Sequence, residues 1–390
     1  MSSSTGQDQL TLTTGSLSPA AVAALETLRR QYFALVAPYM LRIPGSDVLA
    51  TAPAQEFLVN RLLEGPLPQP EAGYARGFWR RVLPVIEAGV HAIDDDDEAA
   101  VDERIYETVA GLMAAPSTNA EGAPAQSHKT FLYDLPNNAG ERSVTLLEEQ
   151  VAVQAGTTGL RTWTAALHLA HHCIYSQDEL FGSVEVPPIV EIGAGTGFLS
   201  IVLAQLGADV IATDLGGDEE DEEGEVRRTP LARLKANIEL NTSASLRHPP
   251  TARPLDWNLA RAPVSERGES WLECAAPAQS GSQRTVLAAD VIYDPEIVPL
   301  LVDTIHELLQ PWKATGNDDS AATAPEPVAI IAATVRNEQT FALFLARCKA
   351  QNLDTELLQL APMDPQHPTF WDTALDAGTR VEIVRIKRNA

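Results

Sequence analysis

The sequence predicts an α/β fold, on three observations. Short apolar runs typical of buried strands alternate with segments whose apolar residues recur at helical spacing. A glycine-rich turn links the first run of this series, residues 189–192, to the helix that follows it. Later runs end close to acidic residues, as expected where a parallel sheet binds a ligand at its carboxyl edge. We therefore expect a parallel sheet with right-handed crossovers and helices on both faces.

The region before this series predicts a separate, small helical domain at residues 18–115. Its apolar periodic stretches are 18–36, 52–64, 75–91 and 99–114. We expect most of its aromatic residues in a core, namely Tyr32, Phe33, Tyr39, Phe57, Phe78 and Trp79. Residues 1–17 are rich in Ser, Thr, Gly and Gln and predict a disordered tail. Residues 116–127 are rich in Pro, Ser, Ala and Gly and predict a linker. The helical domain is a candidate for substrate docking.

The stretch from Ile189 to Asp214 predicts the ligand site. It reads as a strand at 189–192, a turn at 193–197, a helix at 198–206 and a second strand at 208–213. Asp214 stands at the end of the second strand, where a carboxylate can accept hydrogen bonds from a ribose. The turn contains three glycines, which lack Cβ and let the backbone come close to a ligand.

The spacing of these glycines distinguishes two classes of cofactor. A dinucleotide site has G-x-G-x-x-G, but here the spacing is G-x-G-x-G and Phe198 holds the place of the last glycine. Glu191 lies inside the first strand, where its carboxylate would repel a pyrophosphate. The same carboxylate suits a positively charged cofactor without phosphate, such as S-adenosylmethionine. A dinucleotide, or a glycine turn without any ligand, remains as an alternative.

The remaining segments complete the sheet. We expect a hairpin at 129–133 and 143–147, then the segment Gly156–Trp163 leading into a helix through His172. The further strands are expected at 251–255, 285–293, 328–335, 355–360 and 381–388. Helices are expected at 231–241, 296–309 and 338–351, and irregular chain at 260–283 and 313–327. The acidic run at 216–229 cannot bury itself and predicts a solvated insert.

Composition limits the classes of partner and compartment. The chain of 390 residues has a formal charge of −25, which disfavours direct binding to nucleic acid. Twelve of its acidic residues lie in the segments 94–98 and 218–225. Its 3 cysteines lack metal-ligand spacing, and His171 and His172 point to different sides of a helix, so we expect no metal. No long apolar run or signal-like start occurs, and we expect a cytoplasmic monomer without membrane contact.

These residues together resemble the seven-strand, class I S-adenosylmethionine-dependent methyltransferases, and more narrowly the family-16 protein-lysine methyltransferases. The resemblance covers residues 128–390. It is carried by Trp163, EIGAGTG at 191–197, Asp214, LDW at 255–257, and Asp290-Val-Ile-Tyr293, which matches the family motif [D/E]-x-x-[Y/F]. GTTGLRTW, ending at Trp163, together with the helical domain is most similar to the eukaryotic elongation factor 2 lysine methyltransferases.

The resemblance implies roles for the residues around the glycine turn. Gly193, Ala194 and Gly195 would pass along the cofactor with their backbone. Glu191 would lie near the positive end of S-adenosylmethionine, and Asp214 would hold the ribose hydroxyls.

The resemblance also implies the rest of the pocket. Asp256 and Trp257 would border the adenine, and Trp163 and Ala289 would line the pocket. The implied activity is methyl transfer to a lysine of a protein, with elongation factor 2 as the expected target. A small-molecule methyltransferase and a non-catalytic binding scaffold with the same fold are the alternatives.

Two residues belong to the substrate side in the family that the sequence resembles. Asp290 would bind the target ammonium and orient its lone pair after proton loss, and Tyr293 would contact it through its aromatic face. Each also has a simpler interpretation, because Asp290 can cap a turn and Tyr293 can be a packing residue.

Overall fold

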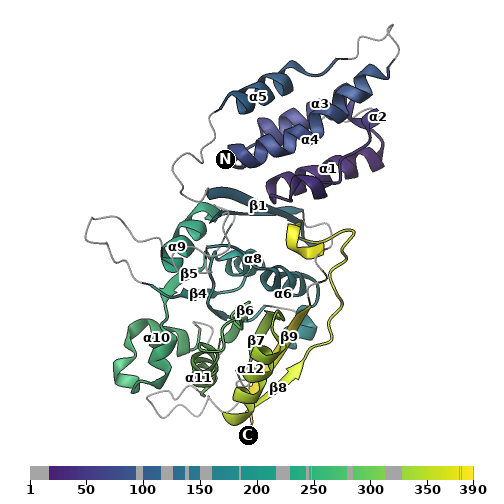
Figure 1. The fold of residues 1–390 in the computed structure, drawn as a ribbon. Helices are drawn as coiled ribbons and strands as arrows, with labels where there is room; N and C mark the ends of the chain where they lie inside the picture. The colour runs from purple at the N-terminus through teal and green to yellow at the C-terminus, as the bar shows by residue number, and fades with distance from the viewer. Residues whose placement is uncertain are drawn as a thin grey trace, which may run out of the picture. The chain divides into compact units, whose positions relative to one another are not determined.

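The computed structural model contains two compact units, residues Met1–Thr118 and Asn119–Ala390 (Figure 1). The structure describes residues 17–93, 100–115, 126–136, 140–149, 160–183, 186–216, 229–242, 246, 248–278, 284–311, 327–376, 378 and 380–389. The predicted tail and linker, except for their last residues, lie outside these ranges. So do the acidic segment 94–98, residues 217–228 of the acidic insert, the start of the Gly156–Trp163 segment, and almost all of the predicted loop at 313–327.

The first unit is helical, as predicted. Its helices are α1 (Pro19–Phe33), α2 (Ser46–Leu49), α3 (Ala52–Leu58), α4 (Ala72–His91) and α5 (Glu103–Ala114), with the short helices η1 (Pro38–Met40) and η2 (Val59–Leu63). Ser18 begins α1, since its side chain accepts a hydrogen bond from the Ala21 amide. The predicted aromatic core is largely confirmed: Tyr32, Phe33, Phe57, Phe78 and Trp79 are buried. Tyr39 is the exception, with 76% of its surface exposed.

The second unit is built on a seven-stranded sheet with the order β5-β4-β3-β6-β7-β9-β8 (Figure 1). The strands are β3 (Ile189–Ile192), β4 (Val210–Asp214), β5 (Thr251–Pro254), β6 (Thr285–Ala289), β7 (Ala329–Thr334), β8 (Leu353–Leu357) and β9 (Val381–Arg388). The first five of the order run parallel, whereas β9 is antiparallel to both of its neighbours. The predicted α/β class is thus confirmed, with a seven-stranded Rossmann-like sheet that is mixed rather than wholly parallel because of β9.

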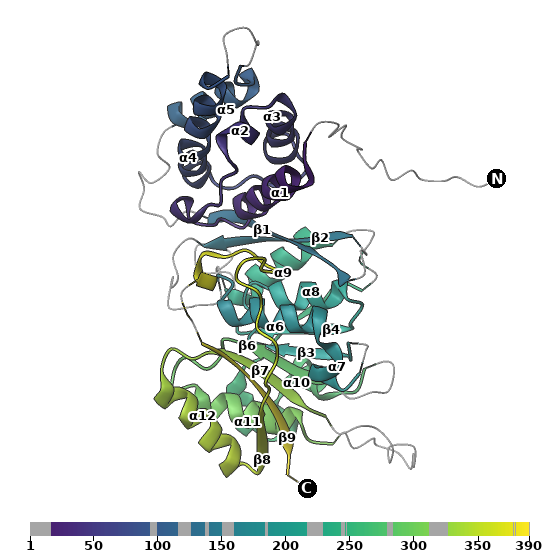
Figure 2. The same ribbon diagram turned by 90° about the vertical axis from the view of Figure 1, so that its right-hand side faces the viewer.

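Helices cover both faces of this sheet (Figures 1 and 2). One face carries α6 (Thr164–Tyr175), α8 (Phe198–Gln205) and α9 (Pro230–Asn241), and α7 (Gln177–Phe181) follows α6 directly. The other face carries α10 (Gly268–Ala275), α11 (Val298–Leu308) and α12 (Glu338–Ala350). Alternation along β3 divides its side chains between the faces: Val190 and Ile192 join the core below α11 and α12, while Glu191 points to α8. This places a carboxylate on the face of β3 that α8 covers.

A separate antiparallel hairpin precedes the sheet, as the sequence predicts, although its strands are longer than expected. It consists of β1 (Gln126–Asp134) and β2 (Glu141–Glu149). Side chains of α9 continue its hydrogen bonding, because Asn237 and Asn241 accept from the backbone amides of Leu147 and Thr145 at 2.9 Å. These hydrogen bonds fix the hairpin to α9.

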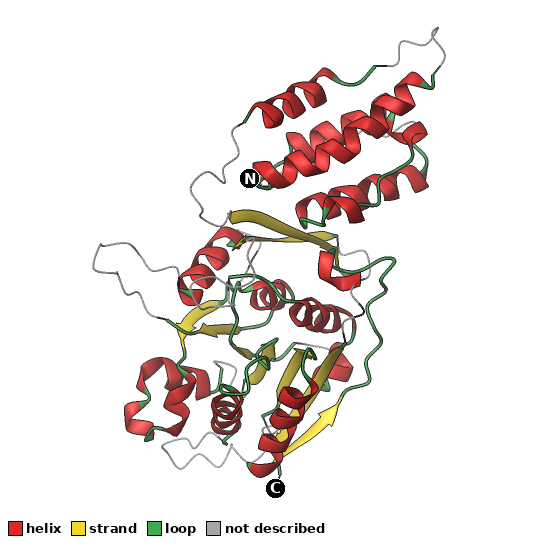
Figure 3. Ribbon diagram, viewed as in Figure 1, coloured by secondary structure: helices red, strands yellow, loops and turns green. Residues whose placement is uncertain are grey.

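Two predictions about local structure are corrected. The strand predicted at 285–293 ends at Ala289, because Asp290 adopts the left-handed conformation with φ 56° and turns the chain. The segment predicted to be irregular from 260 contains η5 (Trp257–Arg261), η6 (Val264–Glu266) and helix α10, which appear among the helices of Figure 3. Its order comes from tertiary contacts, since Trp271 and Cys274 are buried in the core of the sheet.

The short helix η8 (Thr373–Asp376) lies between β8 and β9 in the chain. Within the described ranges, no helix is long and apolar enough to cross a membrane.

Candidate cofactor and substrate site

A cavity of about 480 Å³ opens at the carboxyl ends of the parallel strands. Its volume lies within the range of small-molecule sites in proteins. The structure brings every site residue predicted from the sequence to the lining of this cavity: Trp163, Glu191, Gly193, Ala194, Gly195, Asp214, Asp256, Trp257, Ala289, Asp290 and Tyr293. They come from strand ends and turns far apart in the chain, so their convergence is a property of the fold. Their individual roles remain predictions.

The glycine turn has the backbone conformation that the sequence predicts. Gly193 has φ 68° and Gly195 has φ 55°, a region that L side chains rarely adopt. A Cβ at Gly193 would lie 2.9 Å from Cγ1 of Val291 and 3.4 Å from the Trp257 ring. Any larger residue would therefore displace two parts of the cavity wall.

Asp214 ends β4 and closes the turn. Its Oδ2 accepts a hydrogen bond from the Gly195 amide at 2.6 Å, and its Oδ1 accepts from the Leu215 amide at 2.7 Å. Burial raises the pKa of Asp214 to about 6, although both hydrogen bonds oppose this shift. A carboxylate has about four acceptor positions, so these two donors leave capacity for the hydroxyls of a ribose.

Glu191 is a buried carboxyl group with a single hydrogen-bond partner among the described residues. Only 2% of the residue is exposed, and the Ser200 hydroxyl donates to its Oε2. Burial raises the pKa of Glu191 to about 8, and the nearby charge of Asp214 adds to the shift. Ionising Glu191 is unfavourable in the free protein, and a bound cation would stabilise its carboxylate. The residues present therefore fit a phosphate-free cofactor with a positive charge.

Asp256 and Trp257 follow β5 at the edge of the sheet. Oδ1 of Asp256 accepts from both the backbone amide and the side-chain amide of Asn258 at 2.9 Å, which begins η5. The Trp257 ring packs close to the backbone of Gly193. The ring is thus a flat wall of the cavity, suited to an adenine.

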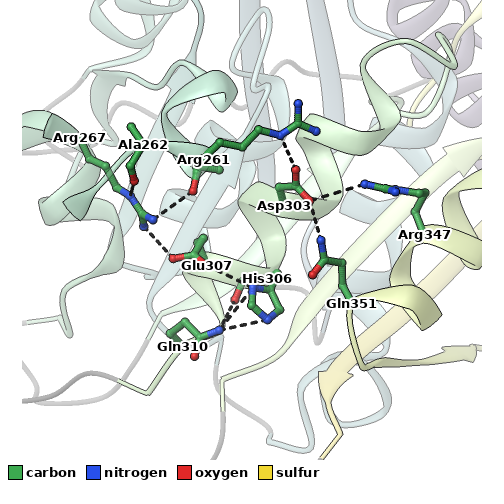
Figure 4. A network of polar contacts seen from close by, with 10 residues as sticks. Arg261, Ala262, Arg267, Asp303, His306, Glu307, Gln310, Arg347 and Gln351 are labelled. Atoms are coloured by element: carbon green, nitrogen blue, oxygen red, sulfur yellow. Dashed lines mark hydrogen bonds and ion pairs between the residues drawn. The ribbon is translucent and has the colours of Figure 1, made fainter.

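A polar network joins α11 to the segment that follows Trp257 (Figure 4). Asp303 accepts from Arg261 at 2.7 Å, and Glu307 accepts from Arg267 at 2.8 Å. Arg267 also donates to two backbone carbonyls of the 256–262 segment, those of residues 260 and 262. Sequence reasoning missed this network, because its two ion pairs join residues 42 and 40 positions apart that have no recognisable spacing.

Asp290 joins three elements through one carboxylate. Its Oδ1 accepts from the Thr334 amide at 2.8 Å, and its Oδ2 accepts from the Thr334 hydroxyl at 2.9 Å. Oδ2 also accepts at 3.0 Å from the Ala165 amide in the first turn of α6. These three donors leave one of about four acceptor positions of the carboxylate for a further group. Asp290 thus has the capping contact that its simpler interpretation predicts, together with a place on the cavity wall.

Trp163 and Tyr293 provide the aromatic surfaces near Asp290. Trp163 is the residue before α6, and the Arg336 guanidinium lies 4.9 Å from the centre of its ring. The same guanidinium lies 3.5 Å from Oδ1 of Asp290 and is about half exposed, at 46%. Tyr293 is also half exposed, at 50%. No sequence pattern points to Arg336, whose position follows only from the turn after β7.

The segment that carries Trp163 is anchored on the glycine turn. The Thr162 amide donates to Glu148 of the hairpin at 3.2 Å, and the Thr162 hydroxyl bonds the Thr196 hydroxyl at 2.7 Å. Asn237 in turn donates to the Thr196 carbonyl at 2.9 Å. The hairpin, α9 and the glycine turn therefore position the wall together.

The fold and this site define a class I S-adenosylmethionine-dependent methyltransferase. A family model described as lysine methyltransferase matches residues 143–315. The chain is 30% identical over 359 residues to protein-lysine N-methyltransferase EFM3 of Chaetomium thermophilum, covering 89% of this chain and 94% of that protein. Two further relatives named protein-lysine N-methyltransferase EEF2KMT are 29% identical in Bos taurus and 30% in Homo sapiens. They cover 70% of this chain each, and 70% and 69% of their own lengths.

The chain belongs to the lysine methyltransferase family. It is an S-adenosylmethionine-dependent protein-lysine N-methyltransferase, with a protein as its substrate. Among the described residues, no group of His, Cys, Asp and Glu is arranged to hold a metal ion.

Proposed function

We propose that this methyltransferase modifies a lysine of translation elongation factor 2. The observation that carries the proposal is the similarity to the two EEF2KMT relatives, at 29% and 30% identity over 70% of this chain. The segment GTTGLRTW and the helical first unit support it, since they resemble elongation factor 2 lysine methyltransferases. We place the reaction in the cytoplasm and expect a monomeric enzyme, which sedimentation velocity tests.

The shared cavity lining supports the cofactor contacts that the family resemblance implies. Glu191 would lie near the positive end of the cofactor, Asp214 would hold the ribose, and Asp256 and Trp257 would border the adenine. When bound, S-adenosylmethionine supplies a methyl group activated by its sulfonium. The protein contributes orientation and a cavity wall that excludes water.

The target lysine must lose a proton before it reacts, because a free lysine has a pKa of about 10.4. The remaining acceptor position of Asp290 holds the ammonium by charge and then keeps a hydrogen bond that orients the amine. Tyr293, with Trp163, offers aromatic faces that accommodate a partly methylated ammonium.

Two variants separate this role of Asp290 from its role in capping α6. In Asp290→Asn the carboxylate is lost, and we expect cofactor affinity to survive while turnover falls by orders of magnitude. In Thr334→Val one hydrogen bond to the same carboxylate is lost, although the charge remains. We expect turnover of Thr334→Val to fall less than about tenfold, as for one lost hydrogen bond. Equal losses of turnover in the two variants would show that Asp290 has only a structural role.

The first unit, residues 18–115, is proposed to dock the protein substrate. Tyr39 is a large apolar side chain that this unit exposes, at 76%. Tyr39→Ser should raise KM for intact elongation factor 2 and leave KM for a short lysine peptide unchanged. A change in both, or in neither, removes Tyr39 from the docking surface.

The substrate proposal is tested with labelled S-adenosylmethionine and purified elongation factor 2, followed by mass spectrometry of the product. We expect label on a single lysine, and none with Asp214→Ala at a cofactor concentration that saturates the wild type. The same assay is run on a lysate. Label on another protein there, but not on elongation factor 2, would support the family activity and refute the proposed target. Label only in small molecules would favour the alternative of a small-molecule methyltransferase.

A further inference from the structure

The charges around the cavity are unequal. Four lining residues are acidic: Glu191, Asp214, Asp256 and Asp290. Among the lining residues of the described chain, Arg161 is the one cation. S-adenosylmethionine carries positive charge on its sulfonium and ammonium but also a carboxylate at its amino-acid end. The acidic residues suit the positive groups, and the carboxylate needs a different partner.

The Arg161 guanidinium is available for such a partner. It is half-buried, and within the described part of the chain it has neither a hydrogen bond nor an ion pair. Its charge acts weakly on Asp372, whose pKa is held below its usual value against the effect of burial chiefly by Lys129. Asp372 is already bound by Lys129, with 2.5 Å between Nζ and Oδ2. A second cation is therefore not needed there.

The position of Arg161 is fixed by its neighbours. Thr162 is bonded to Thr196 of the glycine turn, and Trp163 begins α6, which lies against β6 and β7. Asp256 follows β5, an edge strand that β4 and β3 separate from β6. Because the adenine end of the cofactor is assigned to Asp256, Arg161 stands toward the amino-acid end.

We propose that Arg161 binds the carboxylate of the amino-acid end of S-adenosylmethionine. The proposal uses the cofactor of the family and goes beyond the residues that the family motifs indicate. A guanidinium matches a carboxylate with two parallel N–H donors, and such charge-assisted bonds are stronger and more directional than neutral ones. Arg161 thus selects the intact cofactor and fixes which end of it faces Trp163.

The test compares two ligands that differ only in this carboxylate, S-adenosylmethionine and its decarboxylated form. Affinities are measured by calorimetry for the wild type and for Arg161→Met. We expect Arg161→Met to weaken S-adenosylmethionine by about 10- to 100-fold, as for a lost hydrogen bond to a charged group. The affinity for the decarboxylated form should change less than about threefold, because the lost partner is absent from that ligand.

Two control variants sharpen the result. Arg161→Lys keeps the charge and should retain part of the preference for the carboxylate. Arg336→Met removes a guanidinium that touches Trp163 without lining the cavity, and should leave the ratio of the two affinities unchanged. Equal weakening of both ligands by Arg161→Met would show a structural role and overturn the proposal. Unchanged binding of both ligands would overturn it as well.

Discussion

Glu191→Gln tests the electrostatic basis of cofactor binding. In the free protein burial raises the pKa of Glu191 to about 8, so the carboxyl group is mostly neutral at pH 7. A cationic ligand prefers the ionised form, and ionising a group one unit below its pKa costs about 1.4 kcal/mol. Affinity for S-adenosylmethionine should therefore rise with pH and level off above about 8. Relative to that limit it should be lower by about 10-fold at pH 7 and about 100-fold at pH 6.

The variant provides the reference for this measurement. The glutamine side chain introduced by Glu191→Gln cannot ionise, and its oxygen can still accept the hydrogen bond from Ser200. Calorimetry of both proteins between pH 6 and 9 gives a ratio of affinities in which titration of the ligand itself cancels. We expect the ratio of wild-type to variant affinity to rise about 10-fold per pH unit below pH 8. A constant ratio would refute the assignment of Glu191 to the positive end of the cofactor.

The same shift makes a prediction about stability without ligand. For an acid whose pKa is raised on folding, the stabilising contribution is complete below the unfolded pKa, near 4.5. It is lost as pH rises through the folded pKa of about 8. Thermal unfolding should therefore show that Glu191→Gln gains stability relative to the wild type between pH 6 and pH 9.

Three other substitutions probe the wall, the frame and the substrate side. Gly193→Ala should weaken cofactor binding, because the new Cβ would lie 2.9 Å from Val291 and 3.4 Å from the Trp257 ring and would displace the cavity wall; the left-handed backbone should separately cost about 1–2 kcal/mol of folding stability. Gly207→Ala, with φ 96° and nothing within 4 Å, is its control: calorimetry should show unchanged binding. Lys129→Met leaves Asp372 buried without its ion pair and should lower the free energy of unfolding by about 3–5 kcal/mol in denaturant titrations; a loss under about 1 kcal/mol would contradict this. Tyr293→Ala should lower methylation of protein with cofactor affinity intact, while Tyr293→Phe stays active; equal loss in both would point to the hydroxyl.

The fold was largely predictable because its signals are local. Residues 189–214 contain a buried strand, a glycine turn and an apolar helix in direct succession, and each is encoded by neighbouring residues. The acidic residues of the site follow strands, so parallel topology alone brings Asp214 and Asp256 to one edge. In the structure these positions converge on one cavity.

Contacts between distant segments were not predictable. Helix α10 is short and lies within a segment rich in Pro, Ser, Gly and Ala, and Arg267, the residue before it, is held by Glu307, 40 residues further along the chain. The end of β6 at Ala289 depends on the backbone of Asp290, which is held by α6 and β7. Arg161 was visible two residues before Trp163, but its spacing does not show that it lines a cavity.

The ion pair between Lys129 and Asp372 also has a consequence for the order of folding during synthesis. Its partners are 243 residues apart, so at about 5–20 residues per second the ribosome makes Asp372 about 10–50 s after Lys129. Until then the hairpin holds a lysine that is buried in the finished protein but has no counter-charge from Asp372. The glycine turn at 193–197 is synthesised within this interval. The ion pair that holds the hairpin beside it can therefore form only after Asp372 has been made.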